Sequence, residues 1–144
     1  MKVGTYKTKL YKGKPVTFRV VDIKSESVFD CVTIIPNKEG KDRYICNENI
    51  GYFSERYQKW IIREAQDSSD GATCAKDIDS FGWLFHDELC DTGKWEDDEP
   101  CTNWQGSQVL TDIMKIEGYW FRTRSWFVGT WLFGGEKLRD NGMW

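Results

Sequence analysis

Residues 78–93, IDSFGWLFHDELCDTG, are the stretch from which we interpret the rest of the sequence. It holds the only histidine of the chain, His86, followed directly by Asp87. At about 100° per residue, four apolar residues fall on one side of a helix: Phe81, Leu84, Phe85 and Leu89. Trp83 and Cys90 share the opposite side with His86, so both sides are covered. The stretch therefore predicts a buried helix, begun by an aspartate cap and ended by a Thr-Gly pair.

An imidazole in such a helix can be a general base, a metal ligand or a hydrogen-bonded group of the core. Adjacent helical residues point about 100° apart, so His86 and Asp87 must find partners on other elements. We expect Asp112, on a later helix, to orient His86 as a general base, which makes His86, Asp112 and Asp87 the catalytic candidates. Asp70 and Asp87 would then bind a divalent cation through carboxylate oxygens. In the alternative, His86 donates to one aspartate and the other carboxylates brace backbone amides, so that the network is structural.

Size and charge restrict the class of protein. With 144 residues and a net charge of -3, the chain is predicted to be a single domain with a hydrophobic core and no nucleic-acid partner. No apolar run reaches the roughly 18 residues that a membrane span needs. The lysine-rich N-terminus has no apolar signal segment, so we expect no transmembrane or secretory segment.

The cysteine pattern predicts reduced thiols. Five cysteines are spread through the chain, and no pair has the C-x-x-C spacing of ordinary zinc sites. Without a signal segment, buried thiols in a reducing compartment are the expected state. A zinc site made of His86, Cys74, Cys90 and Cys101 is the less favoured alternative, because structural zinc ligands usually come in closely spaced pairs.

Hydrophobic periodicity separates the chain into a β half and an α half. Alternating or apolar runs predict strands at residues 6–11, 15–23, 28–35 and 43–46, and residues 59–65 are short enough to be strand or helix. Thr102 and Gln105 fit a capping box before a helix that Gly118 ends, and residues 119–133 predict a strongly aromatic helix. We expect an α+β fold, in which an N-terminal antiparallel sheet packs against two to three C-terminal helices. Residues 1–66 are mainly β, residues 67–135 are mainly α, and residues 136–144 form a loosely held tail.

Four short motifs follow one another in a specific order. They are Ser69-Asp70-Gly71-Ala72-Thr73, His86-Asp87-Glu88-Leu89, Thr111-Asp112 and Trp131-Leu132-Phe133-Gly134. This ordered set resembles a small family of uncharacterised proteins from tailed bacteriophages and prophages. The resemblance covers about half the chain, and it departs from the family in lacking proline between Pro36 and Pro100. It implies a phage origin, other virion proteins as partners, and four polar positions of interest: Asp70, His86, Asp87 and Asp112.

We therefore expect a phage-encoded accessory protein, associated with the virion as a tail or head component, with a His/Asp cluster as a candidate hydrolytic site. It would be located in the virion or in the host bacterial cytoplasm, and a second copy of the chain is a further candidate partner. One alternative is a small metal-assisted hydrolase that acts on lipid, peptide or glycan of the host envelope during entry or lysis. The other is a purely structural assembly protein with a buried His/Asp network. Whether the chain is an enzyme stays open at this stage.

Overall fold

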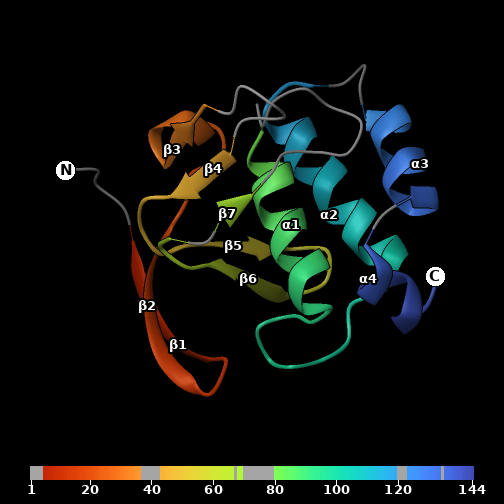
Figure 1. The fold of residues 1–144 in the computed structure, drawn as a ribbon, viewed down its shortest axis with the longest axis horizontal. Coiled ribbons are helices and arrows are strands. Elements are labelled where there is room, and N and C mark those ends of the chain that lie inside the picture. Colours follow the sequence, from red (N-terminus) through yellow and green to blue (C-terminus); the bar gives the residue numbers. More distant parts are fainter. Residues whose placement is uncertain (1–4, 37–42, 67, 70–79, 120–122, 134) are drawn as a thin grey trace.

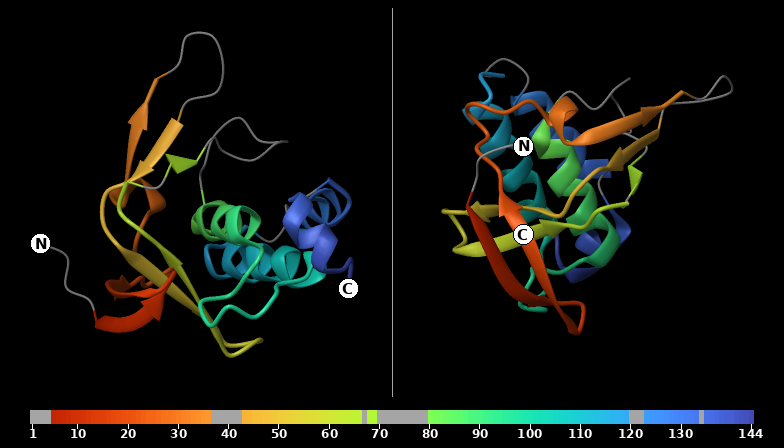
Figure 2. Two further views of the ribbon diagram at one scale, coloured as in Figure 1. Left: turned by 60° about the horizontal axis from the view of Figure 1, so that its bottom comes forward. Right: turned by 90° about the vertical axis from the view of Figure 1, so that its left-hand side faces the viewer.

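The computed structural model describes residues 5–36, 43–66, 68–69, 80–119, 123–133 and 135–144. The fold is α+β, as the sequence predicts: a curled sheet from the N-terminal half faces a layer of helices from the C-terminal half (Figures 1 and 2). Among the residues in these ranges, no helix is long and apolar enough to cross a membrane.

The larger sheet has the strand order β1-β2-β5-β6. It consists of β1 (Tyr6–Tyr11), β2 (Lys14–Val20), β5 (Ile50–Ser54) and β6 (Lys59–Arg63). The β1–β2 hairpin turns through Lys12 and Gly13, whose φ angles of 52° and 79° match a two-residue hairpin turn. The β1–β2 and β5–β6 pairs are antiparallel, whereas β2 and β5 form a short parallel pair, so the sheet is mixed.

A smaller sheet extends away from the helices (Figure 2). It has the order β3-β4-β7 and consists of β3 (Val32–Ile35), β4 (Arg43–Cys46) and β7 (Ser68–Ser69). A short 3-10 helix, η1 (Val28–Asp30), precedes it, with Ser27 and Asp30 forming a capping box. The run at residues 28–35, which periodicity predicts to be one strand, is therefore divided into a helical turn and a strand.

Four helices follow: α1 (Phe81–Thr92), α2 (Asn103–Ile116), α3 (Thr123–Phe133) and α4 (Glu136–Asn141). α1 lies between the larger sheet and α2, and α3 lies beyond α2 (Figures 1 and 2). Ser80, rather than one of the aspartates before it, caps α1 by accepting a hydrogen bond from the Gly82 amide. Gly93 ends α1 in the left-handed conformation at φ 69°. The capping box of Thr102 and Gln105 at the start of α2 is confirmed.

The C-terminal residues are docked rather than loosely held. Leu138 of α4 is completely buried, and the Asn103 amide donates to the Gly142 carbonyl at 2.9 Å. The Asn141 side chain donates to the carbonyls of Gly93 and Cys101 at 2.7 and 2.9 Å. The prediction of a loose tail is wrong, because these backbone carbonyls lie far from residues 136–144 in the sequence and are met only after folding.

Candidate functional site

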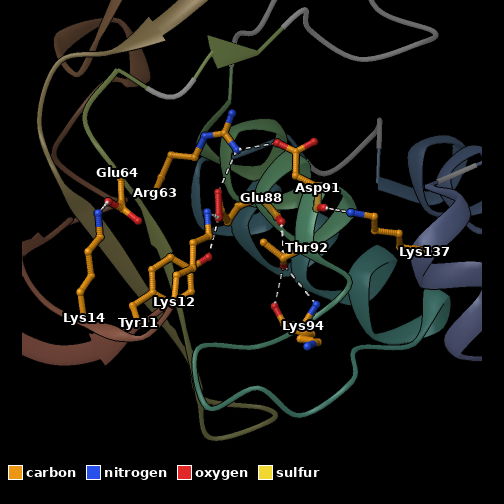
Figure 3. Close-up of polar contacts among 10 residues, drawn as sticks. All are labelled: Tyr11, Lys12, Lys14, Arg63, Glu64, Glu88, Asp91, Thr92, Lys94 and Lys137. Carbon is orange, nitrogen blue, oxygen red and sulfur yellow. Dashed lines mark hydrogen bonds and ion pairs between the residues drawn. The ribbon is translucent and has the colours of Figure 1, made fainter.

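The densest buried polar cluster surrounds Glu88, a residue that the catalytic prediction does not include. Glu88 lies on the side of α1 that faces the larger sheet, and it is 2% exposed. Its carboxylate accepts a hydrogen bond from the Tyr11 hydroxyl at 2.5 Å and from Arg63 Nη1 at 3.2 Å (Figure 3). Lys12 Nζ lies 3.4 Å from the same carboxylate. We call Tyr11, Lys12, Arg63 and Glu88 the Glu88 network.

The Glu88 network joins three elements that are distant in sequence. Tyr11 ends β1 and Lys12 starts the hairpin turn, Arg63 ends β6, and Glu88 lies in the second half of α1. Arg63 is also completely buried, and its Nη1 lies 3.3 Å from the exposed Asp91 carboxylate. These contacts fasten the hairpin tip to the helix layer. Removal of the glutamate would leave a charge inside the protein without this partner.

The sequence does carry a signal for Glu88. Residue 88 follows Leu84 by four positions and Phe85 by three, so its carboxylate belongs to the apolar face of the helix. A charge on that face needs buried partners. Tyr11 and Arg63, its partners, lie 77 and 25 residues away, so helical spacing alone does not identify them.

His86 lies on a different side of the same helix, against α2 and α4. It is 4% exposed, and its ring packs edge-on against Trp83 and close to Gly106, where a Cβ would come within 3.7 Å of two ring atoms. Its hydrogen-bond partner is the Cys90 thiol, 3.6 Å from Nδ1 and 3.9 Å from Nε2. Burial lowers the pKa of His86 to about 4, so the imidazole is neutral at pH 7.

Cys90 and Cys101 are protonated thiols at neutral pH. Burial raises the pKa of Cys90 to about 12, with a smaller contribution from the negative charge of Asp87. Burial also raises the pKa of Cys101, and the nearby Cys90 raises it further. Thiolate, rather than thiol, is the nucleophile and the metal ligand. The pair His86–Cys90 is therefore a neutral contact of the core and is poorly suited to attack a substrate. Cys74 of the alternative zinc site lies outside the described residues.

Asp112 is held by partners other than His86. Its carboxylate receives two hydrogen bonds from Arg56, at 2.8 and 3.0 Å, and one from Gln108 at 3.0 Å. Arg56 belongs to the turn between β5 and β6, so Asp112 faces the end of the sheet. The structure does not bring together Asp112 and His86, and the expected orienting hydrogen bond between them is not made.

Asp87 and Asp70 are the two residues predicted to bind a cation. Asp87 is half-buried on α1, close enough to Cys90 for its charge to raise the pKa of that thiol, and Asp70 lies outside the described residues. Within the part of the chain that the structure describes, no group of three or more His, Cys, Asp or Glu residues could hold a metal ion. The roles of Asp70 and Asp87 in cation binding stay predictions.

A second buried charge cluster surrounds Arg19 of β2, which is 1% exposed. Its guanidinium lies 2.7 Å from Glu26 and 2.6 Å from Glu48 and donates weakly to the Cys31 sulfur at 3.5 Å. Burial alone would lower the pKa of Arg19, but the hydrogen bonds to Glu48 and Glu26 outweigh it and raise the pKa. This cluster ties β2 to the loop that precedes the smaller sheet, through Glu26, and to the loop between β4 and β5, through Glu48.

Three aromatic residues of α3, Trp126, Phe127 and Trp131, are packing residues. Trp126 packs at 5.1 Å from Trp83 of α1, and Trp104 of α2 packs at 4.7 Å from Phe127 (ring centroids). Trp131 and the 74% exposed Trp144 complete a cluster around Trp104. These contacts attach α3 and the C-terminus to α2.

No protein-family model, curated protein or solved structure matches this chain. A functional interpretation therefore has to come from the chain's own residues and their geometry.

Proposed function

We propose that this protein is a phage accessory protein that acts by binding other proteins of the virion, and that its buried polar clusters serve the fold rather than hydrolysis. The phage context comes from the resemblance of the four ordered motifs. The observation that carries the rest is the environment of His86. It is the only histidine of the chain, and imidazole is the side chain whose ordinary pKa lies near neutral pH.

His86 lacks what a general base requires. Such a base exchanges a proton with a substrate or water, and its pKa lies near the working pH. The His86 ring is 4% exposed, its hydrogen-bond partner is the Cys90 thiol, and its pKa of about 4 leaves it a weak base. The carboxylate expected to orient it, Asp112, is bound to Arg56. These observations support the structural alternative for the His/Asp residues.

A binding function depends on the side chains at the surface. Large apolar side chains are exposed on both layers of the fold: Tyr6, Leu10, Phe29, Ile34, Ile35, Ile116, Val128, Leu132 and Trp144. The buried clusters around Glu88 and Arg19 hold the hairpin, the sheets and α1 in place beneath this surface. A frame held in this way, with exposed apolar side chains, is suited to binding in which this chain itself adapts little and affinity comes from surface contacts.

Replacement of His86 by Asn tests this proposal. Asn keeps part of the hydrogen bonding but cannot act as a base near neutral pH. If His86 is structural, the substitution lowers the unfolding free energy of the protein by about 1–3 kcal/mol. We expect a lowered melting temperature together with unchanged, baseline rates on lipid, peptide and glycan substrates. A variant with normal stability that has lost a hydrolytic activity of the wild type would overturn the proposal.

A further inference from the structure

The first strand of the larger sheet has an open edge. The Val20 amide donates to the Thr5 carbonyl at 2.7 Å, and the register pairs Lys7 with Phe18 and Lys9 with Val16. In an antiparallel pair, the backbone N–H and C=O groups of successive residues point alternately toward the neighbouring strand and away from it. The backbone N–H and C=O groups of Tyr6, Thr8 and Leu10 therefore point away from β2. None of them makes a backbone hydrogen bond to another residue of the described ranges.

This edge borders a hollow of about 450 Å³. Thr8, Lys9 and Leu10 of β1 and the hairpin turn form one wall, and Glu96, Asp97 and Asp98 of the loop after α1 form the other. The loop is fixed in place, because the Glu96 amide donates to the Trp60 carbonyl of β6 at 3.3 Å and Lys59 pairs with Asp97 and Glu99. The hollow is thus bounded on one side by unpaired backbone groups and on the other by a fixed acidic loop.

The side chains at this edge also favour a particular partner. Tyr6 and Leu10, 55% and 68% exposed, lie on the outer face of β1 together with Thr8. On the inner wall, Lys12 is paired with Glu88 and Asp97 is paired with Lys59. Among the described residues, Lys9, Glu96 and Asp98 form no ion pair, which leaves one positive and two negative charges facing the hollow.

We propose that an extended peptide segment of a partner protein adds a strand to β1 in this hollow, with alternating apolar and basic side chains. Its backbone pairs with Tyr6, Thr8 and Leu10, as in other cases of strand addition. Its apolar side chains lie beside Tyr6 and Leu10 on the outer face. Its Arg or Lys side chains lie on the same face as Lys7 and Lys9 and extend past these lysines across the hollow to Glu96 and Asp98. The proposal specifies the partner of the binding role proposed above and rests on that role.

Three capped heptapeptides test the side-chain preference. Each has Val at the odd positions, and the even positions are Arg, Gln or Glu. We expect the Arg peptide to bind the full-length protein most tightly and the Glu peptide most weakly in fluorescence anisotropy. Equal affinities, a preference for the Glu peptide, or no binding of any of the three would overturn the proposal.

Charge reversal identifies the acidic wall. Since an exposed ion pair contributes about 0.5 kcal/mol, the double variant Glu96→Lys/Asp98→Lys should bind the Arg peptide at least about fivefold more weakly. Glu55→Lys/Asp140→Lys is the matched control, because it makes the same change in net charge at two exposed residues that do not line the hollow, and it should bind as the wild type does. Equal losses in both variants would contradict the assignment.

Backbone pairing is tested at Thr8. Thr8→Pro removes an N–H that points away from β2, so the hairpin keeps its ladder while the added strand loses a donor. Thr8→Val is the control, because it loses the same hydroxyl contact to Thr17 but keeps the N–H. We expect Thr8→Val to bind the Arg peptide and Thr8→Pro to bind it at least about tenfold more weakly.

Amide hydrogen exchange in the wild type gives a second readout that does not depend on a variant folding. Saturating Arg peptide should slow exchange at Tyr6, Thr8 and Leu10 and leave Lys7 and Lys9, already paired with β2, nearly unchanged. Binding without this pattern would overturn strand addition. Failure of the peptide experiments, with His86→Asn behaving as a structural variant, would remove this proposal and leave the proposed function in place.

Discussion

His86 and Glu88 are two residues apart on α1, and both are buried, at 4% and 2% exposure. The protein treats them in opposite ways. His86 meets a thiol, a tryptophan edge and the surface of α2, and it stays neutral. Glu88 meets a hydroxyl, an ammonium and a guanidinium from the sheet layer. One helix therefore has an apolar interface toward α2 and α4 and a charged interface toward the sheet.

The contrast shows that residue type alone does not indicate the role of a side chain in α1. The histidine is the more conspicuous residue for chemistry, but the environment with several charged groups belongs to the glutamate. The two interfaces should also respond differently when a side-chain group is removed. Removal of a group at the charged interface leaves a buried charge, whereas removal at the neutral interface leaves a partly filled space.

The largest effect is expected at Glu88. Glu88→Ala removes the buried carboxylate next to the completely buried Arg63, and should lower the unfolding free energy by about 3–5 kcal/mol. Urea denaturation at pH 7 measures it. Asp91→Asn is the control, because Asp91 is exposed and contacts the same guanidinium; it should cost less than about 1 kcal/mol. Similar costs for both variants would mean that Glu88 is not the centre of the network.

The second largest effect is expected in the pH dependence of stability, which reports on His86 at the neutral interface. The pKa of His86 is about 4 in the folded protein, against about 6.5 in the unfolded chain, so between these values the unfolded state binds the extra proton. Stability should fall as the pH is lowered from 6.5 to 4, and by about 3 kcal/mol at most, since each pKa unit is worth about 1.4 kcal/mol. In His86→Asn this part of the pH dependence should disappear. A variant with the same pH slope as the wild type would contradict the assignment.

Tyr11→Phe removes one donor from the Glu88 carboxylate and keeps the ring in its cluster with Val16, Phe18 and Ile62. We expect a loss of about 1–2 kcal/mol, which is typical of a hydrogen bond to a charged group. Lys12→Met is a useful comparison, because the Lys12 side chain is 45% exposed and its ion pair is screened by solvent. It should cost less than Tyr11→Phe in thermal unfolding, and a larger cost for Lys12 would contradict this order.

The smallest effect is expected at Asp112. Asp112→Asn weakens a half-exposed ion pair with Arg56, so it should cost less than about 1 kcal/mol. Because Asp112 makes no contact with His86, the pH dependence described above should be unchanged in this variant. If Asp112→Asn altered the titration of His86, the two residues would be coupled after all, and the catalytic interpretation would regain support.

Local signals in the sequence were sufficient for most helices and strands. The capping box at Thr102 correctly predicts the start of α2, and the glycine after α1 correctly predicts the end of that helix. Both signals act within one helical turn. Strand β5 was missed, since it is short and contains Gly51. A side chain at that position would meet the Phe18 ring, whose nearest atoms lie 2.4 Å from an added Cβ. The need for glycine at position 51 comes from a residue of another strand, so it produces no periodic pattern in the sequence of β5.

The candidate site was harder to predict than the fold, for a related reason. His86, Asp87 and Asp112 were selected by residue type, but their partners depend on how α1 and α2 rotate against the sheet. Arg56, which holds Asp112, and Tyr11, which holds Glu88, are more than 50 residues from those carboxylates. The apolar face of α1 does contain the information that Glu88 needs a buried partner.

The titration of His86 tests the central claim most directly. NMR of protein labelled with 15N at its single imidazole can follow the ring nitrogens from pH 8 to pH 4. Our account predicts a neutral ring throughout pH 5 to 8 and protonation only near pH 4, where burial is overcome. A ring that titrates at pH 6.5 or above would show that His86 reaches solvent or a carboxylate, and would contradict the conclusion that it is a neutral residue of the core.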